Sequence, residues 1–503
     1  MLTRCRRLLK TIGYRAVSRI IDYKITRYTR YKTLDYGFIR YGLLALLAGL
    51  TIVACSSGPF GSTVSLDKTS ETTSETISAR TSKESLIVLW DKGYVTEEDE
   101  AIQKVVDDWN AQSDLQVELS FYNSGEIAPR TLRFSQAGQS PDILFAAKSV
   151  YPVSDWDGKL ADVSDVVSPL LESYTEVALR SAKVYGSEKA GDRYYAVPLN
   201  QSTTHIYYWK DLLQEAGYRP ADIPAEWDDF WAFWQTVQDN LAPAYPGLRS
   251  IGLPYSKNAS DTYHIFEHVL SAYNVTLVDA QGKLLVDDPT VKAGIVDCLN
   301  WYLQFYKAGY APSEAVRWLD PENNRNFLNR AVVMTPNPTM SIPAAVRNDD
   351  AIYLEQLGTV PFPNKPDGAP LPHFVSIRQA VVFADAPNVR GAKDFLTYLT
   401  QPAVLSDFLK ASYGRYIPPS IGHIEADLFW QDAADPHVSA VVETVMAGQT
   451  QPFQNVYNPA YGMVMEQNVW GQAVYDVAMN NMSAEEAATA AIAQIKSIFQ
   501  SQL

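Results

Sequence analysis

Short apolar segments alternate with helical segments early in the folded chain, and this alternation limits the possible folds more than any other feature. Residues 86–90 (LIVLW) form an apolar run that is typical of a buried strand. Residues 97–113 place apolar side chains at helical spacing behind a first turn of acids. A strand at 115–122, a helix near 130–137 and a strand at 141–147 follow. This order is the pattern of a parallel sheet, so the sequence predicts an α/β fold.

Polar residues come directly after the first two predicted strands. Asp91 and Lys92 follow the first strand, and Asn123 follows the second. In parallel sheets, ligands bind beyond the carboxyl ends of the strands, so we expect these side chains at a ligand site. For Asp91 and Lys92 the competing interpretation is a solvated turn, which is what a charged pair usually indicates.

The remainder of the chain indicates a second α/β unit. With 503 residues, the chain is too long for one ordinary domain. The expected strands are 194–199, 331–336 and 379–384. The expected helices are 209–216, 226–240, 262–272, 291–307, 390–400 and 483–499, and the last begins with a capping box of Ser483 and Glu486.

The first 54 residues indicate a targeting segment. Residues 1–40 contain 11 Lys and Arg against two Asp, and they lead into an uncharged apolar run at 41–54. These 14 residues are fewer than the roughly 20 that a membrane-spanning helix needs. The run ends in Ile52-Val53-Ala54-Cys55, which resembles the bacterial lipobox. We interpret 1–54 as a signal peptide with a long basic n-region; an uncleaved anchor helix is the alternative.

Cys55 is the expected lipidation site and the expected first residue of the mature chain. Residues 55–85 are rich in Ser and Thr and poor in apolar residues, so we expect a disordered tether there. The other cysteines are Cys5 in the n-region and Cys298, which leaves no pair for an internal disulfide in the mature chain. The sequence thus predicts a lipid-anchored protein at the cell membrane that faces the periplasm or the cell exterior.

The charge of the chain excludes some functions. Because residues 1–40 carry +9 of the total of −15, the remainder carries −24. Such an acidic body repels nucleic acid, and the sequence has no basic patch with interleaved aromatic residues. It also contains no G-x-S-x-G elbow and no P-loop. We therefore expect neither a nucleic-acid partner nor a cofactor.

Residues 264–268 contain the pattern H-x-x-E-H, formed by His264, Glu267 and His268. Helical positions four apart share a face, so the two imidazoles could bind one Zn²⁺ while the glutamate polarises a bound water. The pattern supports the alternative hypothesis of a zinc metallopeptidase. The competing interpretation is that these side chains pack or face solvent. A glycosidase would need two carboxylates that flank a sugar, and no local motif indicates them.

Six segments, in order along the folded chain, resemble one protein family. They are 89–110, 141–145 (PDILF), 197–218 followed by 226–230 (EWDDF), 327–339, 390–420 and 484–495. They resemble the extracellular solute-binding proteins of ATP-binding-cassette (ABC) importers, in the carbohydrate-binding family that includes maltose-binding protein. The resemblance covers about 400 residues, and it departs from the family pattern at Asn329-Arg330, where the family usually has Gly.

The resemblance implies an α/β, two-lobe, periplasmic-binding-protein-like fold of type II, with a ligand cleft between hinge-connected lobes. Its expected lobes are 86–199 plus 376–450 and 200–375 plus 451–503, with crossings near 199–202, 373–377 and 448–458. It implies a monomeric, non-enzymatic receptor that captures a carbohydrate and delivers it to the membrane subunits of an ABC importer. A sensory adaptor of the same fold is a further alternative.

The resemblance also points to ligand-binding residues in the first lobe and the hinge. Asp91 and Lys92 correspond to polar sugar contacts of the family, and Ser202 and Thr203 lie where its hinge segment offers polar contacts. The maltose branch has a carboxylate at the position of Ser202, which implies a different ligand or ligand orientation. The branch also has a Trp where this chain has Ala146, and Trp156 is the candidate that replaces that ring.

Further candidates combine aromatic platforms with polar groups, as sugar sites do. Asp261 and Tyr263 lie near the positions from which the family's second lobe contacts sugar. The remaining candidates are Tyr413 and Arg415, in a loop that approaches the cleft in the family, and the possible platforms Trp318 and Trp470. Trp470 lies on an aromatic and Met-rich helix, where core packing is the competing explanation.

Overall fold

The computed structural model describes residues 85–147, 158–184 and 190–501, all within the compact unit Glu75–Leu503. The signal segment, Cys55, most of the tether and Trp156 lie outside the described residues. Within these ranges, no helix has the length and apolar character needed to cross a membrane.

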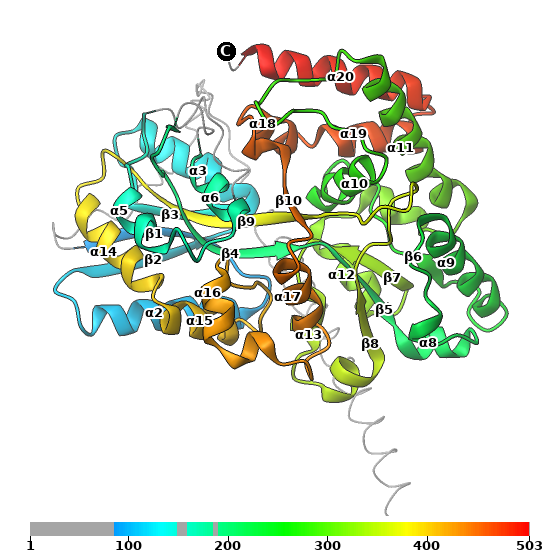
Figure 1. Ribbon diagram of the computed structural model, residues 1–503, viewed down its shortest axis with the longest axis horizontal. Coiled ribbons are helices and arrows are strands. Elements are labelled where there is room, and N and C mark those ends of the chain that lie inside the picture. Colours follow the sequence, from blue (N-terminus) through cyan, green and yellow to red (C-terminus); the bar gives the residue numbers. More distant parts are fainter. Residues whose placement is uncertain (1–84, 148–157, 185–189, 502–503) are drawn as a thin grey trace, which may run out of the picture. The chain divides into compact units, whose positions relative to one another are not determined.

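The first of two sheets contains the strands expected near the start of the folded chain. In it β1 pairs in parallel with β2 and β3, while β9 runs antiparallel to both β3 and β4 (Figure 1). Its strands are β1 (Ser85–Asp91), β2 (Gln116–Tyr122), β3 (Ile143–Ala147), β4 (Val197–Thr203), β9 (His373–Val382) and β10 (Thr450–Pro452).

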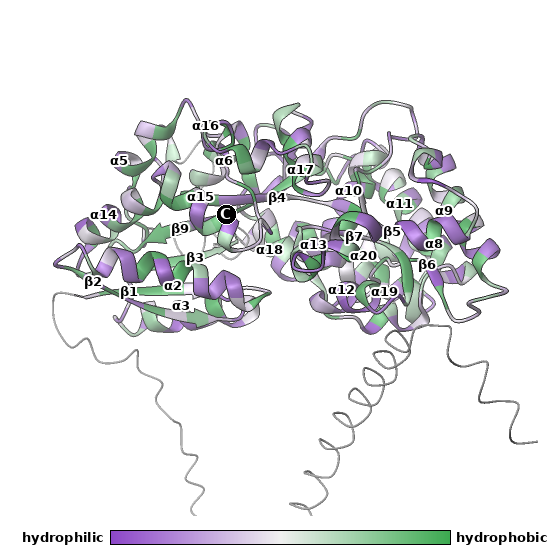
Figure 2. Cartoon of the chain, turned by 90° about the horizontal axis from the view of Figure 1, so that it is seen from below, coloured by the Kyte–Doolittle hydropathy of each residue, from purple (hydrophilic) through white to green (hydrophobic). Residues whose placement is uncertain are grey.

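Helices cover this sheet because each has one apolar face. In α2 (Thr96–Asn110), Ala101, Ile102, Val105 and Val106 are buried, and the opposite face is polar, so purple and green alternate along the helix in Figure 2. The other helices of this part are α3 (Ser124–Gln136), α5 (Ser164–Val167), α6 (Glu176–Ala182), α14 (Val389–Leu399), α15 (Pro402–Ala411), α16 (Ile421–Ala426) and α17 (Val438–Met446).

The second sheet has the strand order β6-β7-β5-β8. Its core is rich in aromatic rings, among them Trp227 and Trp231, which both pack against Trp301. The strands are β5 (His205–Trp209), β6 (Arg249–Ile251), β7 (Val332–Asn337) and β8 (Leu357–Val360). The helices around it are α8 (Lys210–Glu215), α9 (Trp227–Leu241), α10 (Ser260–Ala272), α11 (Pro289–Ala308), α12 (Asp320–Leu328), α13 (Ser341–Val346), α18 (Tyr461–Glu466), α19 (Val469–Met479) and α20 (Ala484–Ser501).

The chain passes between the two sheets at three places. A single residue, Thr204, separates β4 of the first sheet from β5 of the second. The chain returns between β8 and β9, and it leaves the first sheet again after β10 to form α18, α19 and α20. The hydrophobic cores follow the sheets: one holds residues around β5 to β8 and the last three helices, and two others surround the first sheet.

Three histidines lie together where these crossings meet. His205 begins β5, His373 begins β9, and their rings stack with centroids 5.0 Å apart. His268 of α10 approaches the ring of His373 edge-on at 6.4 Å. The backbone N–H of Phe374 donates to Nε2 of His268, so Nδ1 of that ring carries the proton and donates to the carbonyl of His264. The His268 ring is thereby held neutral.

We expect this histidine cluster to make the fold sensitive to acid. Burial lowers the pKa of His205 and of His268 from 6.5 to about 3, and it also lowers that of His373. Between pH 6.5 and 3 these histidines are protonated in the unfolded chain but neutral in the folded chain. The free energy of unfolding therefore falls as the pH falls.

His268→Gln should reduce this slope by up to about 1.4 kcal/mol per pH unit, because one ionisable group is removed. Denaturant titrations of the wild type and the variant at several pH values measure the slope. A difference in stability that stays constant across this pH range would contradict the prediction.

Candidate ligand-binding site

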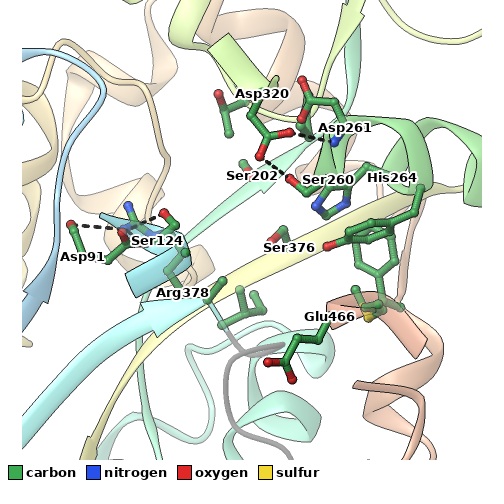
Figure 3. Close-up of a pocket in the computed structure, with 18 of the residues that line it drawn as sticks. Asp91, Ser124, Ser202, Ser260, Asp261, His264, Asp320, Ser376, Arg378 and Glu466 are labelled. Carbon is green, nitrogen blue, oxygen red and sulfur yellow. Dashed lines mark hydrogen bonds and ion pairs between the residues drawn. The ribbon is translucent and has the colours of Figure 1, made fainter. Parts of the chain in front are cut away.

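A cavity of about 660 Å³ lies between the two sheets and takes its walls from both. Figure 3 shows Asp91, Ser124 and Arg378 on one side and Ser260, Asp261, Asp320 and His264 on the other, with Ser202 and Ser376 between them. The crossing strands β4 and β9 place these two serines directly opposite each other, because Ser202 pairs with Ser376 in their ladder. The cavity therefore lies over the strands that connect the two sheets.

A buried ion pair forms the wall on the first sheet. Nη2 of Arg378, on β9, donates to Oδ2 of Asp91 at the end of β1 over 2.8 Å, and both side chains are more than nine-tenths buried. Ser124 donates to the other carboxylate oxygen of Asp91 over 2.7 Å. The guanidinium also lies over the rings of Phe145 and Tyr416. These contacts fix Asp91 and Arg378 in place and satisfy most of their charge.

A second arginine is fixed in the same way. Nη1 of Arg415 donates to both carboxylate oxygens of Glu98, over 2.9 and 3.0 Å. Glu98 is itself held at the start of α2, where it accepts a hydrogen bond from the backbone N–H of Tyr94. The Arg415 guanidinium lies over the ring of Tyr94, which also lines the cavity. This arrangement presents an aromatic ring and a neutralised ion pair to a ligand.

Two carboxylates lie at the opposite wall, at the starts of α10 and α12. Asp320 accepts hydrogen bonds from the Ser260 hydroxyl (2.9 Å) and from the backbone N–H of Asp261 (3.2 Å). Asn323 donates to Oδ2 of Asp261 over 2.9 Å. Burial and the neighbouring Asp320 raise the pKa of Asp261 well above its usual range, and burial raises the pKa of Asp320 as well. Ionisation of these two acids at this wall therefore costs free energy.

Aromatic rings continue this wall. The rings of Tyr263 and His264 lie 4.3 Å apart, and His264 meets Phe453 edge-on at 5.1 Å. Burial lowers the pKa of His264 to about 3, so its ring is neutral at physiological pH. Within the described residues, Nδ1 of His264 has no hydrogen-bond partner. Ring faces beside polar atoms are the surfaces that bind small polar ligands with an apolar side.

Five of the sequence candidates line this one cavity. They are Asp91, Ser202, Asp261, Tyr263 and Arg415, and they come from segments far apart in the chain. Trp156 lies outside the described residues.

Six other candidates lie elsewhere. Lys92 and Asn123 are exposed at the strand ends, so the solvated-turn interpretation fits Lys92. Thr203 is buried beside His205, whose Nδ1 lies 3.0 Å from its hydroxyl. Tyr413 contacts Asn348 and Glu97 through its hydroxyl instead of lining the cavity.

Trp318 and Trp470 are packed in the core of the second sheet, with 2% and 1% of their surface exposed. The indole N–H of Trp470 donates to the hydroxyl of Tyr461, and its ring packs against Phe266. Core packing thus accounts for Trp470, and neither ring can act as a platform in this conformation.

Sequence reasoning missed several residues of the cavity. Arg378 and Ser376 lie on β9, just before the strand predicted at 379–384, and Asp320 and Phe453 were not among the candidates. Arg378 carried a readable signal, because a charged residue inside an apolar strand is buried only when it is paired. His264 was a candidate metal ligand, with packing or solvent exposure as the competing interpretation, and was not expected at a ligand cavity.

The H-x-x-E-H pattern does not form a metal site. His264 faces the cavity, whereas His268 stacks on Phe362 and Glu267 is fully buried and accepts a hydrogen bond from the hydroxyl of Tyr461. The three side chains therefore have different surroundings. Across the described residues, no group of three or more His, Cys, Asp or Glu side chains could hold a metal ion. The zinc-peptidase hypothesis has no support in this geometry.

Comparison with known proteins identifies the class of this chain. Residues 104–437 match the model of the family described as bacterial extracellular solute-binding protein. This match covers more than half of the chain, so the protein belongs to that family. Its members bind solutes and are not enzymes. No curated protein matches the chain.

Solved structures with the same fold are distant in sequence. A solute-binding protein of an ABC transporter from Thermotoga lettingae, bound with α-D-tagatose, is 18% identical, with a TM-score of 0.68 over 82% of this chain and 99% of its own. The maltose-bound MalE3 of T. maritima is 18% identical, with a TM-score of 0.66 over 82% and 100%. UgpB of Mycobacterium tuberculosis, in complex with glycerophosphocholine, is 16% identical, with a TM-score of 0.64 over 83% and 99%. The expected two-lobe fold is confirmed.

Glu267 should destabilise the fold at neutral and higher pH instead of serving a metal. Burial raises its pKa from 4.5 to about 7, against the opposing effect of the hydrogen bond from Tyr461. Between pH 4.5 and 7 the folded chain keeps a proton that the unfolded chain releases, so stability falls as the pH rises.

Glu267→Gln removes this ionisation. Relative to the wild type, the variant should gain up to about 3 kcal/mol in free energy of unfolding between pH 4.5 and pH 7, as measured by denaturant titration. Addition of Zn²⁺ should leave both proteins unchanged. A zinc-dependent stabilisation that Glu267→Gln abolishes would contradict this account.

Proposed function

We propose that this protein is a lipid-anchored receptor that captures a carbohydrate in the cavity and delivers it to an ABC importer. The observation that carries the proposal is the cavity itself. It joins aromatic rings and fixed polar groups from two sheets that are linked by three crossings. Sugars present hydroxyls around apolar ring faces and need both kinds of surface.

The two walls of the cavity suit a trap that closes on its ligand. Arg378 and Asp91 belong to the first sheet, whereas Asp261 and Tyr263 come from α10 beside the second. A ligand that contacts both walls stabilises the closed arrangement by its higher affinity for that state. For this trap we propose the lobes 86–199 plus 376–450 and 200–375 plus 451–503.

The relatives support a carbohydrate without fixing its identity. Two similar structures are bound with α-D-tagatose and with maltose, and a third is in complex with glycerophosphocholine. Ser202 stands where the maltose branch has a carboxylate, so we propose a sugar other than a maltodextrin or a different sugar orientation. We propose that the receptor is a monomer and that its partner is an ABC importer, which the family relationship supports.

A thermal-shift screen of the full-length chain in detergent tests the ligand class. A carbohydrate present at about 100 times its Kd adds about 2.7 kcal/mol to stability, which raises the Tm of a chain of this size by roughly 3 °C. The panel contains neutral mono- and oligosaccharides, with glycerophosphocholine as a non-carbohydrate ligand. A shift with glycerophosphocholine and none with any carbohydrate would reject the carbohydrate part of the proposal.

Tyr263→Ala should weaken binding of the sugar found in this screen about tenfold or more, because a ring in contact with the ligand is lost. Tyr245→Ala is the matched control, since Tyr245 is 40% exposed and does not line this cavity. Isothermal titration calorimetry compares both variants with the wild type. Equal affinities in all three proteins would place the sugar elsewhere.

The anchor is tested separately at Cys55. Cys55→Ser removes the thiol that would carry the lipid, so the variant expressed in a bacterial host should leave the detergent phase on phase partitioning, whereas the wild type stays in it. Cys298→Ser is the control, because this buried cysteine lies in α11. Retention of the Cys55→Ser variant in the detergent phase would support an uncleaved anchor helix.

A further inference from the structure

The charges around the cavity do not balance. Arg378 is neutralised by Asp91 and Arg415 by Glu98, each through a buried ion pair. These pairs consume the two arginines that line the cavity. The net charge that a ligand would meet therefore depends on the other charged side chains that line the cavity.

Asp261 and Asp320 have no ion-pair partner among the described residues, and the cation that favours ionisation of Asp261, Arg415, is already bonded to Glu98. Both acids line the cavity. Their hydrogen-bond donors are neutral groups, namely the Asn323 amide, the Ser260 hydroxyl and a backbone N–H. Lys257 also lines the cavity, but its ammonium group lies over the ring of Tyr475 at 5.0 Å.

Helix capping accounts for only part of this arrangement. Asp320 accepts from two groups at the start of α10, which is a favourable place for an anion. Asp261 has no such role, since its carboxylate is bonded by a side chain of α12. Burial and the neighbouring Asp320 together raise the cost of ionising Asp261, as its raised pKa indicates. Capping of α10 requires only Asp320, so it does not explain the presence of Asp261.

An unsatisfied hydroxyl also lines the cavity. Ser202 of β4 is only 4% exposed, and its Oγ has no hydrogen-bond partner within the described residues. It lies between the two walls in Figure 3. A buried hydroxyl without a partner costs free energy, and a bound polar ligand would supply the missing bond. Ser202 thus points to a ligand independently of the acidic pair.

We infer that the ligand carries a cationic nitrogen that binds between Asp261 and Asp320, while Ser202 and the rings of Tyr263 and Phe453 contact the rest of it. The inference rests on the proposed receptor function and names the ligand class: an amino sugar or a similar polar amine. An ammonium group supplies both the missing positive charge and N–H donors for carboxylate oxygens. The neighbouring ring faces also attract a cation.

The test compares sugars that carry a cationic nitrogen with sugars whose nitrogen is neutral. Glucosamine and its disaccharide carry a protonated amine, and their N-acetylated forms are neutral. Calorimetry on the full-length chain in detergent, at a pH that keeps the amine protonated, should give at least about tenfold tighter binding for the amines. Choline, which has a cation but no N–H donor, distinguishes charge from hydrogen bonding.

Asp320→Asn should remove this preference. We expect binding of the amines to weaken about tenfold and binding of the N-acetylated sugars to change little, because only the amine loses an ion pair. Asp261→Asn should act in the same direction, so the result does not depend on one variant folding. Asp228→Asn is the control, since this exposed acid lies in the first turn of α9 and away from the cavity. Circular dichroism confirms the fold of each variant.

Each outcome decides the inference. Preferential binding of the amines or of choline supports the inference if Asp320→Asn abolishes it. A preference for choline would show that the aromatic rings and the carboxylate charges bind the cation without N–H hydrogen bonds. Equal or tighter binding of the neutral sugars overturns it and leaves the carbohydrate receptor standing. Failure of every cationic probe also overturns it, and the neutral sugars then decide the proposed function by themselves.

Discussion

The antiparallel pairing of β4 with β9 is the contact on which the rest of the structure depends. Both strands belong to the first sheet, and both lie next to a segment that enters or leaves the second. Their register brings Ser202 opposite Ser376, and Arg378 follows two residues later on β9. The same ladder therefore joins the two halves of the molecule and places polar side chains under the ligand. A change of register by one residue would turn these side chains to the other face of the sheet.

The pairing of charges determines which side chains can respond to a ligand. Arg378 and Arg415 are held by carboxylates and stacked on aromatic rings, so they form a rigid wall. Asp261 and Asp320 are held only by neutral donors. A cationic solute would therefore lower the electrostatic energy at the second wall much more than at the first. The two walls would therefore have different roles: the first orients the ligand, and the second stabilises a positive charge on it.

Local patterns predicted most of the fold. The first five elements, the long helices and the capping box of Ser483 and Glu486 depend on neighbours within a few residues, and all are present. The strand β5 was missed because it follows β4 after one residue and shows no turn signal. The site was harder, since partners such as Asp91 and Arg378 lie far apart in the chain. Trp470 has the composition of a ligand platform, and only its packing shows otherwise.

The direct passage from β4 to β5 has a mechanical consequence. Residues 197–209 contain no glycine, and Thr204, which alone separates the strands, is 2% exposed. Any rotation of one half against the other must twist this backbone while its buried side chains, including His205, repack. Such a connection resists rotation more than a flexible, exposed linker would. The resistance of this segment would oppose rotation of one half against the other in either direction.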